Sequence, residues 1–134
     1  MEVDFAFLAD KADIVGGKLY VLGGAFDAIS AKQVPVVHSQ MTLAIRFLLS
    51  PSEVNREHKL EVILMDSDGK RIIALPGQFS VKPHPENVLG YKIPFLTALN
   101  FWNIRFEKFG DYSIELLLNG TSIKSIPLRL VQMV

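Results

Sequence analysis

Apolar residues recur at every second position in several stretches of the chain, which is the pattern of β-strands. Between residues 41 and 49 every odd position is apolar, and Thr42 and Arg46 stand among the even ones. Side chains alternate between the two faces of a strand, so this segment has one wholly apolar face. The pattern predicts a strand that covers a hydrophobic core.

Two pairs of alternating stretches flank short turn sequences. Residues 59–64 lead through Asp66-Ser67-Asp68-Gly69 into a second apolar run at 71–75. Residues 112–118 lead in the same way through Asn119-Gly120 into 126–130. Because Asn-Gly and Asp-Gly sequences favour tight turns between antiparallel strands, both regions are predicted to be β-hairpins.

The last stretch is irregular. Its apolar parity slips between Ile123 and Ile126, and Pro127 has no N–H to donate. These features predict either a bulge in this strand or a position at a sheet edge.

Weaker alternation predicts further strands at 3–8, 18–22, 78–82 and 95–106, the last broken near 100–103. The paired glycines at 16–17 and 23–24 are interpreted as turns or bulges. Only Ser50-Pro51-Ser52-Glu53 has a helix signal, and it predicts a short turn with a capping box. The chain is therefore predicted to be all-β, a two-sheet antiparallel β-sandwich of the Greek-key or Ig-like kind. We expect eight or nine strands in a single domain, 1–134.

One tyrosine supports the sandwich over a barrel. Gly110 and then Tyr112 stand at the entrance to a predicted strand. In the tyrosine corner of Greek-key sandwiches, the hydroxyl of such a residue bonds back to the connecting main chain. The alternative is that Tyr112 is only a buried aromatic residue.

Composition excludes several classes of protein. The 134 residues include no cysteine, and 14 basic side chains balance 14 acidic ones. Disulfide scaffolds, cysteine-ligated zinc and thiol catalysis are thereby excluded. A domain without a basic excess does not attract nucleic acid or an anionic membrane, so neither is an expected partner.

The N-terminal sequence does not resemble a secretory signal. Acidic residues stand at positions 2, 4, 10 and 13, and the first base is Lys11. The longest stretch free of charged residues covers 33–45, too short for a membrane-spanning helix. A cytoplasmic location is expected.

The acidic residues permit one alternative reading. Asp66 and Asp68 suit a hairpin turn, but alternating carboxylates are also ligands of calcium. A calcium site on the sandwich loops would require Asp10, Asp13, Asp27 or Asp111 to converge on the same end. The sequence context favours the turn.

No enzymatic site emerges from the remaining motifs. His38, His58 and His84 are far apart in sequence, and His84 has the carboxylate of Glu86 close to it. Glu57 is adjacent to His58, but neighbouring residues on a strand point to opposite faces and cannot act as one acid–base pair. The glycine pairs match no phosphate-binding loop, and no serine lies in a nucleophile elbow. We expect no catalytic residue, no metal ligand and no cofactor.

Several motifs together resemble a known family. They are Gly17–Asp27, Val34–His38, Arg46-Phe47, and Arg56-Glu57-His58 leading to Asp66–Gly69. They resemble a family of small bacterial proteins, about 130 residues long, whose function is uncharacterised. The resemblance covers roughly the first 75 residues. It implies a bacterial, cytosolic β-sandwich without known catalytic residues, in which the recurring His38, Arg56, Glu57 and His58 support loops or form a site.

Apolar residues on both faces of several strands suggest self-association. They include Ala44, Leu48, Ile63, Met65, Ile72, Ala74 and Leu117. A small sandwich has one interior, so we expect part of this surface to contact another chain. The expected function is a non-enzymatic interaction or scaffold module that forms a homo-oligomer, most simply a dimer, or binds another protein. Loops that fold over the outer faces are the competing explanation, and small-molecule or calcium binding at one loop end is the alternative function.

Overall fold

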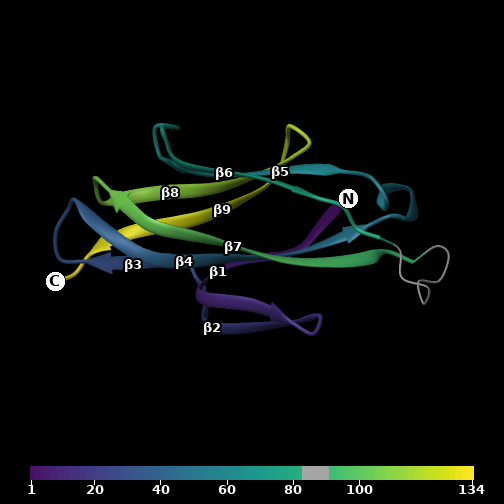
Figure 1. The fold of residues 1–134 in the computed structure, drawn as a ribbon. Helices are drawn as coiled ribbons and strands as arrows, with labels where there is room; N and C mark the ends of the chain where they lie inside the picture. The colour runs from purple at the N-terminus through teal and green to yellow at the C-terminus, as the bar shows by residue number, and fades with distance from the viewer. Residues whose placement is uncertain (83–90) are drawn as a thin grey trace.

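The computed structural model describes residues 1–82 and 91–134 and contains nine strands there (Figure 1). Their bounds are β1 Glu2–Val15, β2 Lys18–Phe26, β3 Ala28–Ala31, β4 Val36–Leu49, β5 His58–Asp66, β6 Arg71–Phe79, β7 Ile93–Phe106, β8 Gly110–Leu118 and β9 Thr121–Gln132. Sheet A has the order β2-β1-β4-β7, and sheet B has the order β3-β9-β8-β5-β6. The all-β, two-sheet prediction is confirmed.

The core lies between the two sheets. In β4 the five odd-numbered residues from Met41 to Leu49 are fully buried, as their alternation predicts. Val62 and Leu64 of β5 and Ile114 and Leu116 of β8 face them from sheet B. The predicted hairpins β5–β6 and β8–β9 are both present.

Sheet B is mixed, whereas the sequence predicts antiparallel sheets. The chain leaves sheet A at Phe26 and enters sheet B at Ala28, where β3 runs parallel to β9. The main-chain N–H of Arg129 donates to the Asp27 carbonyl at 2.8 Å at this crossing. With four residues, β3 is too short for alternation to reveal it.

The predicted irregularities and strand boundaries are confirmed in part. The expected bulge in β9 occurs at Ile123, and β9 lies between β3 and β8, so it is not an edge strand. The break expected within 100–103 is a local distortion of a continuous β7, with Asn103 at a φ of 50°. The strand expected at 78–82 ends at Phe79.

The short helical turn forms where predicted. Residues Pro51–Glu53 form a 3₁₀ turn after β4. The main-chain N–H of Ser50 donates to the Glu53 carboxylate at 2.9 Å, as in a capping box. The Met1 amino group forms an ion pair with the same carboxylate at 2.6 Å.

The tyrosine corner is also confirmed. The Tyr112 hydroxyl donates to the Lys108 carbonyl at 2.5 Å, and its ring packs edge-on against Phe106. Burial raises the pKa of this phenol. The contact fixes the connection between β7 and β8 against the core.

The second half of β1 and β2 form a ribbon on the outer side of sheet A (Figure 1). β1 pairs with β4 only as far as Ala9, after which it continues with β2 alone. We call residues 10–22 the β1–β2 ribbon. Ala9 and Ala12 pack with Ala44 of β4 in a small second cluster, with Leu19 of β2 at its margin. Small side chains allow this close approach.

Contacts within the chain change the interpretation of the outer faces of both sheets. Ala44 is fully buried because it lies in this intramolecular cluster, and Ile63 is only 1% exposed. Arg71 lies opposite Met65 but reaches Glu61 at 3.5 Å, so its side chain crosses the outer face beside Ile63.

The other expected outer residues differ in their environments. Ile72 is displaced by the register shift in the β5–β6 hairpin and packs against the core. Leu48, Met65 and Leu117 are half-buried, and Ala74 is exposed. Coverage within one chain therefore explains much of the apolar pattern that suggested a partner.

Candidate functional site

His58 is a structural residue in the described chain. It is buried, and its ring packs against Phe79. Its Nε2 lies 2.7 Å from the Glu53 carbonyl, and its Nδ1 lies 3.1 Å from the amide nitrogen of Asn119. A neutral ring with its proton on Nε2 satisfies both contacts. His58 thus joins the 3₁₀ turn to the β8–β9 turn.

The four residues noted in the resemblance do not form one site. Arg56 and Glu57 are exposed in the loop before β5. His38 lies near the start of β4, whereas Arg56, Glu57 and His58 follow its end. His84 and Glu86 lie outside the described residues.

Asp66 and Asp68 are turn residues, as predicted. Asp66 Oδ1 accepts the main-chain N–H groups of Asp68 at 3.0 Å and Lys70 at 2.9 Å. The N–H of Lys70 is the main cause that lowers the pKa of Asp66. Lys108 pairs with Asp68 at 2.9 Å, which raises the pKa of the lysine.

The other candidate calcium ligands do not join this turn. Asp10 and Asp13 lie on the β1–β2 ribbon. Asp27 and Asp111 line a separate small hollow with Arg129, which approaches Asp111 at 3.3 Å. Within residues 1–82 and 91–134, no three histidine, aspartate or glutamate side chains are grouped to hold a metal ion.

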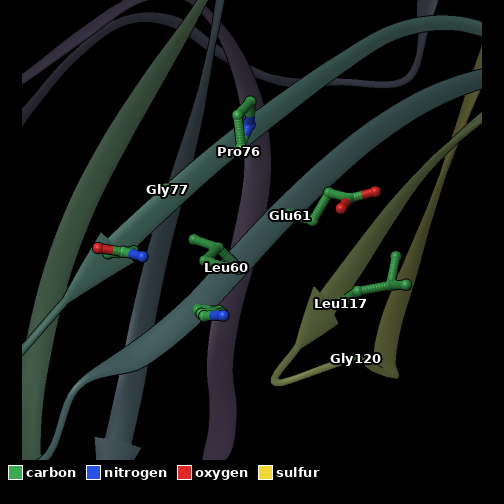
Figure 2. A pocket seen from close by; sticks show the side chains of 8 residues that line it. Leu60, Glu61, Pro76, Gly77, Leu117 and Gly120 are labelled. Carbon is green, nitrogen blue, oxygen red and sulfur yellow. The ribbon is translucent and has the colours of Figure 1, made fainter.

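A shallow groove of about 590 Å³ crosses the outer face of sheet B (Figure 2). Pro76 of β6, Glu61 of β5 and Leu117 of β8 form one row across it. Glu61 is already engaged by Arg71, and Leu60 beneath the groove belongs to the core. Lys59 and Gln78 are the other polar residues that line the groove.

A second hollow, of about 420 Å³, lies where the chain crosses from sheet A to sheet B. We call it the His38 hollow. It is lined by Asp10, Gly23, Gly24, Phe26, Ala28, Ile29 and His38. The Nε2 atom of His38 is buried and has no hydrogen-bond partner among the described residues. A buried ring nitrogen without a partner is uncommon in folded proteins.

The glycine pair leaves this hollow open. Gly23 has a φ of 61°, which favours glycine, and the Asp10 carboxylate occupies the space that a side chain at 23 would need. A side chain at 24 would collide with Val21 and approach Phe7. The close approach of Asp10 to the β2 backbone at this hollow therefore requires glycine at position 23, and the packing beside it favours glycine at position 24.

The second candidate site is the exposed part of the β1–β2 ribbon. Its outer surface carries Tyr20 at 57% exposure and Leu22 at 69%, with Val15 and Val21 also exposed. Trp102 on β7 is another large exposed apolar residue, at 59%. An isolated exposed apolar residue is ordinary, but Val15, Tyr20 and Leu22 share one face of the ribbon and together indicate a contact surface.

Sequence reasoning missed both sites. In the sequence, the residues of the His38 hollow stand out only as a glycine pair, a single histidine and a single aspartate, with nothing that connects them. The signal that could have joined them is the spacing of Gly23-Gly24 and His38 within the stretches that resemble a family.

These features define the class of protein: a small β-sandwich with a β-ribbon folded over one sheet and no metal cluster within its described residues. The chain belongs to a family of unknown function, DUF6941, whose sequence profile matches residues 4–131. No curated protein matches the chain. Among the described residues, no helix is long and apolar enough to cross a membrane.

Proposed function

We propose that the protein is a non-enzymatic interaction module that self-associates as a dimer through the free edge of β2. The observation that carries this proposal is the exposed apolar surface of the β1–β2 ribbon, described above. β2 is the terminal strand of sheet A. Strand edges with exposed apolar side chains readily pair with another chain.

The other sheet edges are less suited to pairing. β6 contains Pro76, which has no N–H, and β3 has only four residues. β7 contains Pro94 and is distorted at Asn103. Residues 18–22 of β2 contain neither a proline nor a positive φ. These differences favour β2 as the edge that associates.

The hydrogen-bond pattern of the ribbon defines the register. Gly16 and Gly17 form a two-residue turn, with φ values of 60° and 76°, so Val15 and Lys18 form a hydrogen-bonded pair. Counting from this pair, the N–H and C=O groups of Leu19 and Val21 point away from β1. Two copies of β2 that pair antiparallel about Tyr20 place Leu19 opposite Val21 of the second copy.

This register is self-complementary. It forms four main-chain hydrogen bonds, each worth about 1 kcal/mol, and brings the two Tyr20 side chains together. Half-burial of four apolar side chains adds about 3 to 6 kcal/mol. Association costs at least about 4 kcal/mol, so we expect a weak dimer with a dissociation constant between tens of micromolar and several millimolar.

Light scattering across a concentration series tests the dimer. The mass should rise from 15.0 kDa toward twice that value as concentration increases. Tyr20→Lys places two like charges opposite each other and should keep the protein monomeric. Trp102→Lys, at a similarly exposed aromatic residue away from this edge, should leave association unchanged.

Cross-linking provides an independent test of the register. The chain contains no cysteine, so any disulfide of Tyr20→Cys must join two copies. Residues directly opposite in a non-hydrogen-bonded pair are close enough for such a bond. Tyr20→Cys should therefore cross-link faster than Trp102→Cys. Equal rates, or a monomeric mass at every concentration, would overturn the proposal.

A further inference from the structure

We propose that Asn119 is a site of spontaneous deamidation, which the folded chain holds closed and which opens when its contact with His58 is lost. The site is separate from the β2 edge and goes beyond the proposed dimer. Asn119-Gly120 is the one Asn-Gly pair in the chain, and it forms the turn between β8 and β9 (Figure 2). Asparagine is a thermally labile residue, and a following glycine has no side chain to hinder attack by its main-chain nitrogen.

The modification needs water but no enzyme. The main-chain nitrogen of Gly120 loses its proton and bonds to Cγ of Asn119, the Cγ–Nδ2 bond breaks, and ammonia leaves with a proton in place of that bond. The product is a cyclic succinimide. Water then opens the ring: cleavage of the new bond to Cγ gives aspartate, and cleavage of the original main-chain bond gives an isoaspartyl linkage. Both products carry an additional negative charge.

Three contacts hold Asn119 in its present conformation. Its main-chain N–H donates to the Lys59 carbonyl at 2.8 Å, and its Oδ1 accepts the Lys59 N–H at 2.9 Å. Because the atom facing this N–H must be an acceptor, the orientation of the amide is fixed, and Nδ2 lies 3.1 Å from Nδ1 of His58. His58 is buried, so this partner is itself held in place.

The turn conformation also opposes ring closure. Asn119 and Gly120 have φ values of 51° and 85°, as in a type I′ turn, in which ψ of the first residue is about +30°. The succinimide ring brings the Gly120 nitrogen and Cβ of Asn119 to the same side of the Cα–C bond. For an L-residue this requires a ψ of about −120°, as in a type II′ turn. The peptide unit after Asn119 must therefore turn over before the ring can form.

Conversion would change the molecule where it occurs. The isoaspartyl linkage adds a carbon atom to the main chain of a two-residue turn, whose flanking residues Leu118 and Thr121 are paired in the ladder. Either product replaces the amide N–H that faces Nδ1 of His58 with a carboxylate oxygen. The link that His58 makes between the 3₁₀ turn and the β8–β9 turn would be lost in the converted molecules.

Peptide mass spectrometry after incubation at neutral pH measures the conversion of Asn119 to aspartate and isoaspartate. Loss of the two side-chain hydrogen bonds must precede the reaction, so Asn119 should react about 30-fold more slowly in the folded parent than in the same chain unfolded in urea. Performing the incubation on Tyr20→Lys as well removes the dimer, so the two proposals can fail separately.

Asp68→Asn provides a matched comparison within one molecule. It creates a second Asn-Gly pair, also in a hairpin turn, at a side chain that is 79% exposed. Position 68 should react faster than position 119 in the folded protein, whereas in urea the two should react at similar rates. This comparison does not depend on any change to the core.

His58→Phe tests the contact itself. The variant removes the acceptor for Nδ2 and should accelerate conversion of Asn119 about fivefold, with folding verified by far-UV circular dichroism. Ile104→Val is the control, because it weakens the core at a buried position opposite His38 on β7, and it should leave the rate unchanged. Equal rates at Asn119 in the folded and unfolded parent, equal rates at positions 68 and 119 in the folded protein, or equal acceleration by the His58 and Ile104 variants would overturn the proposal.

Discussion

Single polar side chains hold the loops of this sandwich to its strands. Glu53, Asp66 and Tyr112 each bond to the main chain of a connection, and Asn119 bonds to both His58 and the main chain of Lys59. These contacts satisfy main-chain groups that the sheet ladders leave unpaired. Stability at the ends of the molecule therefore depends on a few named residues.

Glu53 should make stability depend on pH. Burial opposes ionisation of its carboxyl group, but bonds from the Met1 amino group and from Ser50 outweigh burial and lower its pKa from 4.5 to about 2. A lowered pKa contributes stability above pH 4.5 that is lost as the pH falls toward 2. Glu53→Gln should lower the free energy of unfolding by about 1.5 to 3 kcal/mol at neutral pH.

Urea unfolding at several pH values measures this effect. The difference between Glu53→Gln and the parent should shrink as the pH falls through the window above. Glu57→Gln, at an exposed position four residues away, is the control and should leave stability unchanged. A constant difference at all pH values would contradict the role of the ionised carboxylate.

The turn at Asp66 and Asp68 should tolerate asparagine at both positions. Asn at position 66 can accept the same two main-chain N–H groups, so Asp66→Asn with Asp68→Asn should leave stability nearly unchanged. The double variant loses the negative charge that the Lys70 N–H stabilises and the pairing with Lys108, both at the surface, where such interactions contribute little. Calorimetry should detect no calcium binding in either protein; binding in the parent that the double variant lacks would contradict the turn assignment.

At the scale of elements, alternation predicts the strands whose one face meets the core. β4, β5 and β8 follow it because one face of each strand is buried in the core, although the opposite faces mix polar residues with apolar ones. It fails for β3, which is too short, and for the part of β1 in the β1–β2 ribbon, which buries alanines. Alanine is compatible with either side of a sheet, so Ala9 and Ala12 gave no signal, and Ala44 was interpreted as part of an outer surface.

The candidate sites were harder to predict than the strands. The His38 hollow depends on the register shift of β2 at Ala25 and on the crossing into β3, neither of which local periodicity specifies. His38 and His58 look alike in sequence, but only the fold gives His58 two partners.

Enlarging Ala44 should detach the ribbon while the sandwich remains folded. Ala44 is fully buried against Ala9 and Ala12, so Ala44→Phe does not fit beneath the ribbon. Trypsin should then cleave after Lys11 or Lys18 faster than in the parent. Ala74→Phe, on the exposed part of β6, is the matched control and should not alter cleavage. Unchanged cleavage of the Ala44 variant would show that the ribbon does not rest on β4.

The folding of the whole molecule depends on the single hydrophobic core between the two sheets. Ile45→Lys places a charge in that interior and should unfold the domain, whereas Leu48→Lys, on the half-buried outer face of the same strand, should leave it folded. Far-UV circular dichroism measures both outcomes. For the parent it should show less than about 20% helix, and a higher value would contradict the all-β fold.

The two-residue turn at the end of the β1–β2 ribbon has a practical consequence. A side chain at Gly16 or Gly17 would meet no atom within 4 Å, because the turn extends away from the core. Exposed turns of this kind accept inserted sequence with little loss of stability. In the proposed dimer the two turns point in opposite directions, so an epitope inserted between Gly16 and Gly17 should remain accessible on both copies and would allow the assembly to be captured intact.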